Sequence, residues 1–162
     1  MSTNSFIGMI EHNVLRGIYC HWDGYPSNNG VILNEHYQDD SKIRELIALG
    51  DISYLAEKVK PDNDGNKEDV VCAYGRDRAE EGTEAVSFIR IENFANYIKE
   101  FYYDYIYIRY NHKWYVVKQI HNDHIDCIEL DKVLKSLKND ISGFNTDQKI
   151  TLNQDEYNKQ YK

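Results

Sequence analysis

The sequence predicts a single α+β domain that contains a mostly antiparallel sheet, several short helices and a tyrosine-rich hairpin. The chain of 162 residues is long enough to bury one core and too short for two, so we expect one domain over residues 1–162. Segments with the alternation of strands and segments with the spacing of helices both recur along it. Residues 103–110, which include four tyrosines, and residues 113–120 flank a turn at Asn111 and His112, which is typical of an antiparallel hairpin.

The first elements are predicted to be a strand and a short helix. Residues 14–22 alternate with β-branched and aromatic side chains, as strands do. Residues 23–30 contain the glycine, proline and asparagine that favour a turn. A short helix, capped by Asn28 or Asn29, is expected to follow and to end near Tyr37.

A second helix is expected after residue 40. Ile43, Leu46 and Ile47 share one face at helical spacing, and Gly50 suits the left-handed residue that follows a helix end. Asp51 is then predicted to cap a further helical turn.

The middle of the chain is predicted to contain an exposed loop, two strands and a helix. Residues 60–69 are polar and include proline and glycine, which favours a loop. Residues 70–74 read as a strand, and residues 75–82 as a charged connection. Residues 85–91 predict a short strand, and apolar residues at helical spacing predict a helix from Glu92.

After the hairpin, a strand over residues 125–130 and a lysine-rich helix over residues 131–139 are expected. Apolar anchors then become sparse. Residues from about 145 to 162 are therefore expected to form a loosely ordered tail or to add an edge strand.

The charge is strongly acidic, because 27 Asp and Glu residues outnumber 19 Lys and Arg residues and give a formal net charge of −8. This balance disfavours general attraction to nucleic-acid phosphates and to anionic lipid. Most of the excess lies between Glu35 and Glu92. It predicts either attraction to a basic partner or a surface charge that only maintains solubility.

The cysteines and the first residues favour a cytoplasmic protein. Cys20, Cys72 and Cys127 are odd in number and widely spaced, unlike the disulfide framework of a small secreted domain. The first ten residues lack the pattern of a signal peptide, and no run of about 18 apolar residues is present. We therefore predict no attachment to a membrane.

Two groups of residues could carry chemistry. His21 and Asp23 would share one face of a strand, where they could act as a general base and its orienting acid or only pack and hydrogen-bond. Arg76, Asp77 and Arg78 could hold a carboxylate or phosphate, or could form local ion pairs in a solvated loop.

No metal or cofactor is predicted. His121, His124 and Cys127 are potential ligands, but their spacing matches no established zinc pattern. The aspartates of residues 62–66 lack the glycine position and the bidentate glutamate of a calcium loop. The sequence also contains no nucleophile elbow and no phosphate-binding loop, so an enzyme is not the favoured interpretation.

Several short motifs stand along the first three quarters of the chain. They are Gly17-Ile-Tyr-x-His21-Trp-Asp-Gly-Tyr-Pro26, Asn29-Gly30, Leu33-x-x-His36-Tyr37, Leu46-Ile-Ala-Leu-Gly-Asp51-x-Ser53-x-Leu55 and Tyr74-x-Arg76-Asp-Arg78-x-Glu80. In these motifs the sequence resembles an uncharacterised family of small proteins from tailed bacteriophages and prophages. The likeness covers roughly residues 14–118 and implies a phage accessory role, although it carries over no catalytic residues.

We expect a non-enzymatic accessory protein that binds a host protein, with a possible counter-defence or host-takeover role. The alternative is a small enzyme or nucleotide-binding module that uses His21, Asp23, Arg76 and Arg78. Sequence-specific nucleic-acid binding through aromatic stacking is disfavoured by the net charge, and the oligomeric state stays open. The predicted binding residues are His21, Trp22, Asp23, Tyr25, His36, Tyr37, Arg76, Asp77 and Arg78.

Overall fold

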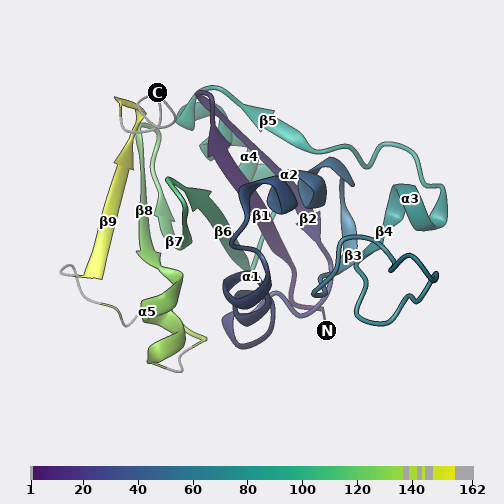
Figure 1. The fold of residues 1–162 in the computed structure, drawn as a ribbon. Coiled ribbons are helices and arrows are strands. Elements are labelled where there is room, and N and C mark those ends of the chain that lie inside the picture. The colour runs from purple at the N-terminus through teal and green to yellow at the C-terminus, as the bar shows by residue number, and fades with distance from the viewer. Residues whose placement is uncertain (1, 137–138, 142–143, 145–147, 156–162) are drawn as a thin grey trace.

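The computed structural model describes residues 2–136, 139–141, 144 and 148–155 and has the predicted α+β fold (Figure 1). Its described strands form one mixed sheet in the order β4-β3-β2-β1-β6-β7-β8-β9, with β5 also paired to β2. Most neighbouring strands are antiparallel, while β1/β6 and β2/β3 are parallel. The strands are β1 Ser5–Glu11, β2 Val14–Cys20, β3 Ile52–Tyr54, β4 Cys72–Ala73, β5 Val86–Phe88, β6 Tyr105–Tyr110, β7 Lys113–Ile120, β8 His124–Glu129 and β9 Lys149–Asn153.

Short helices cover both faces of the sheet. In Figure 1, α1 and α2 lie in front of the sheet and α4 lies behind it. Within the described ranges, no helix has the length and apolar character needed to cross a membrane. The helices are the π-helix η1 Pro26–Gly30, α1 Val31–His36, α2 Asp40–Ala48, α3 Tyr74–Arg78, α4 Ile91–Glu100 and α5 Leu130–Lys135.

Strand β1 lies at the centre of the sheet, although no strand was predicted there. It pairs antiparallel with β2 and parallel with β6. Six of its seven residues are buried because both faces of β1 are covered. Such a strand has a continuous apolar run, without the alternation that identifies a half-buried strand in a sequence.

The two faces of the sheet carry separate cores. One core contains Ile7, Ile18, Tyr107 and Trp114 and is covered by α1, α2 and α5. The other contains Phe6, Leu15 and Ile108 together with residues of α4. Burial of these apolar side chains is the main favourable term in folding, so the sheet is stabilised from both sides.

The α4 face contains a hollow that only glycine leaves open. Gly8 and Gly17 are partners in the β1–β2 ladder. A Cβ atom on Gly17 would lie 2.3 Å from Cζ of Phe6, and a Cβ atom on Gly8 would lie 2.6 Å from Cε1 of the same ring. The Phe6 ring therefore fills the space above the two glycines and packs against Phe94 of α4, with ring centroids 5.2 Å apart.

Two local predictions were wrong. Residues after Asp51 form strand β3 instead of a helical turn, because Ile52 pairs with Cys20 at the end of β2. The charged connection after residue 74 begins with the short helix α3. Its first turn is held by the Asp77 carboxylate, which accepts a hydrogen bond from the amide of Ala73 at 2.8 Å.

The C-terminal region adds an edge strand, as one of the two alternatives predicted. Strand β9 pairs antiparallel with β8 over five residue pairs. Helix α5 ends at Lys135, and residues 137–138 of the predicted helix lie outside the described residues. Of the predicted tail, residues 145–147 and 156–162 also lie outside them.

Candidate functional site

Six rings form a continuous line of contacts, which we call the aromatic strip. Neighbouring ring centroids along it are 4.6, 5.8, 6.2, 6.1 and 4.6 Å apart. Aromatic pairs attract one another over this range of separations. The strip consists, in order, of Trp22, His21, Tyr19, Tyr103, Tyr97 and Phe101.

Three separate elements place these rings. Alternation along β2 puts Tyr19 on the face of the sheet opposite to buried Cys20, and His21 follows two residues later. Helix α4 contributes Tyr97, with Phe101 directly after its end. The segment before β6 contributes Tyr103, so the strip exists only in the folded chain.

Hydrogen bonds fix the polar atoms within the strip. The Tyr19 hydroxyl hydrogen-bonds Nδ1 of His21, and the hydroxyls of Tyr97 and Tyr103 are 2.7 Å apart. Burial raises the pKa of each of these three tyrosines. The phenols therefore stay neutral and hydrogen-bonded over the ordinary pH range.

The N-terminal segment supports the same region. Asn4 and Asp104 exchange two hydrogen bonds, of 3.0 Å to the Asp104 carboxylate and 2.8 Å to the Asn4 side-chain oxygen. This exchange fixes the backbone next to Tyr103 to the start of β1. The rings of Phe6 and Tyr103 meet edge to face at 5.5 Å, which places the strip directly on the core.

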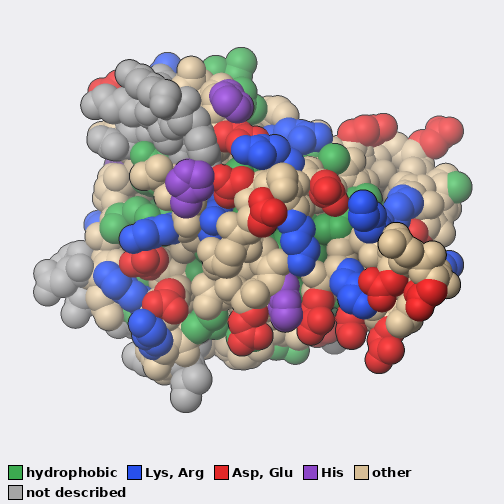
Figure 2. All heavy atoms as spheres, in the orientation of Figure 1, with side chains coloured by type: hydrophobic (Ala, Val, Ile, Leu, Met, Phe, Trp, Pro, Cys, Tyr) green, Lys and Arg blue, Asp and Glu red, His purple; other side chains and the backbone are tan. Residues whose placement is uncertain are grey.

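Both ends of the strip are exposed. Trp22 is 44% exposed and Phe101 is 52% exposed, and the next residue, Tyr102, is 85% exposed. Exposed aromatic surface of this kind is typical of interaction sites. On the face over α1 and α2, Figure 2 shows an interspersed mixture of acidic and basic side chains with separate hydrophobic patches.

Carboxylates give the neighbourhood of the strip a negative charge. Asp51 accepts a hydrogen bond from the amide of Tyr19 at 3.0 Å. Its pKa is raised, first by burial and further by the negative charge of Glu84. The nearby cation Arg78 already stacks over the Tyr74 ring, at 5.2 Å from its centroid. The site thus combines ring faces with carboxylates, which together favour a cationic group.

The structure places Asp23 and Tyr25 in the turn that follows the strip. The Tyr25 hydroxyl donates to the Asp23 carboxylate at 3.3 Å, and the negative charge of Asp23 raises the Tyr25 pKa. The Asp23 carbonyl accepts from the Asn28 side chain at 3.2 Å. His21 and Asp23, proposed as a base and its orienting acid, therefore each hydrogen-bond a different tyrosine.

His36 and Tyr37 belong to another part of the molecule. Nε2 of His36 lies 3.4 Å from the Glu57 carboxylate. Tyr37 is fully buried in the core under α1 and α2, and its hydroxyl donates to the Ala56 carbonyl at 2.6 Å. Tyr37 was predicted as a binding residue, but no atom of its side chain reaches the surface of the folded chain.

Arg76 and Asp77 hold the polar loop in place. The guanidinium of Arg76 donates to the backbone carbonyls of Val59 and Val71, at 2.5 and 2.8 Å. It also donates two hydrogen bonds to the Asp77 carboxylate, at 2.9 and 3.0 Å. Four of its five N–H groups are directed at protein acceptors, which leaves little capacity to clamp a ligand anion.

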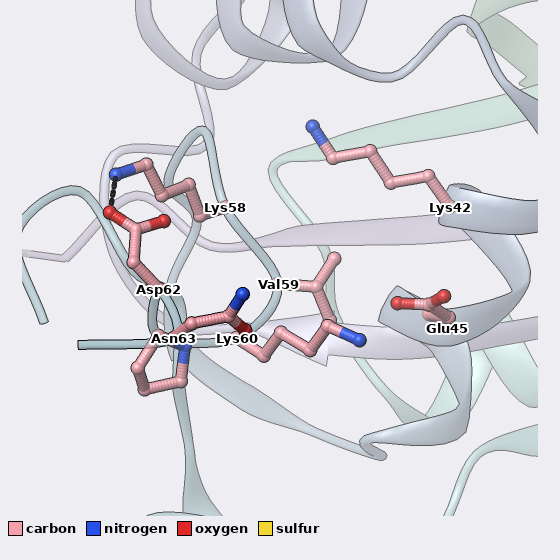
Figure 3. Close-up of a pocket in the computed structure, with 8 residues that line it drawn as sticks. Lys42, Glu45, Lys58, Val59, Lys60, Asp62 and Asn63 are labelled. Atoms are coloured by element: carbon pink, nitrogen blue, oxygen red, sulfur yellow. Dashed lines mark hydrogen bonds and ion pairs between the residues drawn. The ribbon is translucent and has the colours of Figure 1, made fainter. Parts of the chain in front are cut away.

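A shallow pocket between α2 and residues 58–63 has a volume of about 400 Å³ (Figure 3). Three lysines line it, but Lys58 pairs with Asp62 at 2.9 Å. Lys42 donates to two backbone carbonyls, those of His36 and Glu57, at 2.6 Å each. Because two of the three cations are already engaged, the pocket is a weak candidate for binding an anion.

The residues of the strip that sequence reasoning did not assign to the site are Tyr19, Tyr97, Phe101 and Tyr103. The spacing of Tyr97 and Phe101 by four residues on a predicted helix places them on one face, so this pair was accessible from the sequence. The contact of Tyr19 with Tyr103 depends on the tertiary fold. Comparisons with known protein families, with curated proteins and with solved structures found no match to this chain.

Proposed function

We propose that this protein is a non-enzymatic, phage-type accessory protein that binds a host protein through the aromatic strip. The observation that carries the proposal is the continuous line of rings from Trp22 to Phe101, which is exposed at both ends and ordered by hydrogen bonds within it. The resemblance of the first motif to small phage proteins supports a host protein as the partner, in a counter-defence or host-takeover role.

The chemistry of the strip favours a partner that presents arginine or lysine. The net charge of −8 attracts a basic surface from a distance and speeds encounter. At the site itself, Asp51 accepts a hydrogen bond from the amide of Tyr19, and the negative charge of Glu84 acts on Asp51. A guanidinium can stack on an aromatic face while a carboxylate neutralises its charge.

Trp22 and Phe101 are the proposed anchors of the interface. Tryptophan and tyrosine are enriched among residues whose truncation costs 2 kcal/mol or more of binding free energy, which is about a 30-fold loss of affinity. The remaining rings are pre-ordered, so few side chains lose freedom on binding. Nucleic acid offers bases to the same rings, but its phosphates oppose the acidic charge.

The test is a binding titration of the purified protein with basic host proteins captured from a bacterial lysate. Trp22→Ala and Phe101→Ala should each weaken binding by roughly 30-fold, while Ile89→Ala should leave it unchanged. Ile89 is a matched control because it is 65% exposed and lies at the opposite end of α4 from Phe101. Equal affinity of all three variants, or retention of oligonucleotide in place of protein, would contradict the proposal.

A further inference from the structure

The tip of the β7–β8 hairpin gathers two histidines and an aspartate outside the aromatic strip. The amide of His121 donates to the His124 carbonyl at 2.9 Å, directly beside the paired residues Ile120 and Ile125. The two imidazole rings face each other across this turn, with centroids 4.0 Å apart and planes 17° from parallel.

Strand alternation adds the third side chain. Asp126 is two residues after His124 on β8, so both project from the same face of the strand. Ile125 and Cys127 project from the other face into the core that α4 covers. Cys127, which was a potential ligand on the sequence alone, therefore lies on the face of β8 away from the two histidines. Asp126 is the third potential ligand in its place.

The ligand atoms have the separations of a metal site. One nitrogen from each histidine and one Asp126 oxygen all lie within 4.8 Å of one another. Nε2 of His121 is 3.1 Å from Oδ2 of Asp126. Two ligand atoms bound tetrahedrally at about 2.1 Å from one zinc ion are roughly 3.4 Å apart, so an ion fits between this pair with little movement.

Neighbouring side chains orient the three ligands. Thr151 donates to Oδ1 of Asp126 at 2.9 Å, which fixes the carboxylate with Oδ2 toward His121. Nδ1 of His124 lies 2.6 Å from the Asp123 carboxylate, which leaves the Nε2 atom of His124 for a metal. A carboxylate on the second nitrogen of a metal-binding histidine is a common feature of zinc sites.

We propose that His121, His124 and Asp126 bind a divalent first-row transition metal of the Zn²⁺ type. Two imidazoles and one carboxylate are a donor set that suits zinc, and three protein ligands leave a fourth position open to water or to an external ligand. The site is independent of the proposed protein-binding function, because its residues lie on the hairpin tip and not in the aromatic strip.

Two features of the site oppose the binding of an ion. The nearly parallel rings must rotate so that both nitrogens point at one ion, and each histidine side chain is about one-third exposed, which leaves room for rotation. Lys149 lies 3.7 Å from Oδ2 of Asp126 and repels a cation there. Replacing Lys149 by Met should therefore increase the affinity for Zn²⁺.

The experiment is calorimetric titration of the full chain, without a histidine tag, with Zn²⁺. The wild type should bind one ion per chain. His124→Ala should weaken binding by more than about 100-fold, and Asp123→Ala by roughly 10-fold, as expected for loss of a ligand and of an orienting partner. His112→Ala is the matched control, because His112 also lies beside a single carboxylate, Asp40, at 2.9 Å, and should bind Zn²⁺ as the wild type does.

Circular dichroism establishes that each variant is folded, and His121→Ala gives a second removal of a ligand. Binding of Co²⁺ should produce visible absorption bands in the wild type and in His112→Ala but not in His121→Ala or His124→Ala. The proposal is overturned if the wild type shows no saturable Zn²⁺ binding, or if folded His121→Ala and His124→Ala bind Zn²⁺ with unchanged affinity.

Discussion

A double-mutant cycle on Gly17 and Phe6 tests how the aromatic strip is supported. The added methyl group of Gly17→Ala would lie 2.3 and 2.7 Å from two atoms of the Phe6 ring and 2.8 Å from the Ile7 carbonyl oxygen. The backbone of Gly17 does not adopt a positive φ, so the substitution acts through these contacts. Overpacking of this kind costs about 1–3 kcal/mol of stability.

Phe6→Ala empties the same space from the other side. Phe6 is fully buried and contacts the rings of Phe94 and Tyr103, so its truncation should cost about 3–5 kcal/mol. In the double variant the new methyl group no longer meets the ring and partly fills the cavity. The combined cost should therefore fall below the sum of the single costs by about 1–2 kcal/mol.

The assay is equilibrium unfolding in urea, followed by circular dichroism, with the four proteins compared at one temperature. Phe6→Leu replaces Phe6→Ala if the latter is unfolded without denaturant. Costs that add within about 0.5 kcal/mol would refute the reasoning, because the ring and the glycine would then not share the hollow. A fully restored double variant would also be inconsistent, since the contact with the Ile7 carbonyl remains.

Three further outcomes are expected. Tyr37→Phe should lower the free energy of unfolding by about 1–2 kcal/mol in urea titrations, since the partly buried Ala56 carbonyl loses its 2.6 Å donor, and should leave partner binding unchanged. The raised pKa of Asp51 means that the folded state holds the Asp51 proton to higher pH than the unfolded state does. This group therefore makes the free energy of unfolding fall as pH rises from about 3.8 through the folded pKa. Asp51→Asn should flatten the plot of the free energy of unfolding against pH over this range. Mass spectrometry after brief alkylation at neutral pH should find Cys72 labelled first, because Cys20 and Cys127 are buried. Burial also raises the pKa of Cys20 to about 11 and raises the pKa of Cys127, which keeps both thiols protonated.

Local signals in the sequence predicted the elements that depend on local contacts. The β6–β7 hairpin and α2 follow from alternation, helical spacing and turn residues. Strand β1 did not, because a strand buried on both faces has no alternation. Strand β3 was missed because its conformation is set by pairing with β2, more than 30 residues earlier in the chain.

The candidate site shows the same division. His21 and Trp22 were predicted from the density of rings in one short segment, and the structure places them together. Tyr37 was predicted as a binding residue because a tyrosine in that segment gives no local indication of burial. The contact between Tyr19 and Tyr103 joins residues far apart in sequence, and no local pattern encodes it.

The most direct test of the proposed function is affinity capture of basic host proteins by the wild type and by a Trp22→Ala, Phe101→Ala double variant. We expect the wild type and Ile89→Ala to retain the same basic protein, and the double variant, folded by circular dichroism, to lose it. Retention of that protein by the double variant with unchanged affinity would contradict the assignment of the aromatic strip as the binding site.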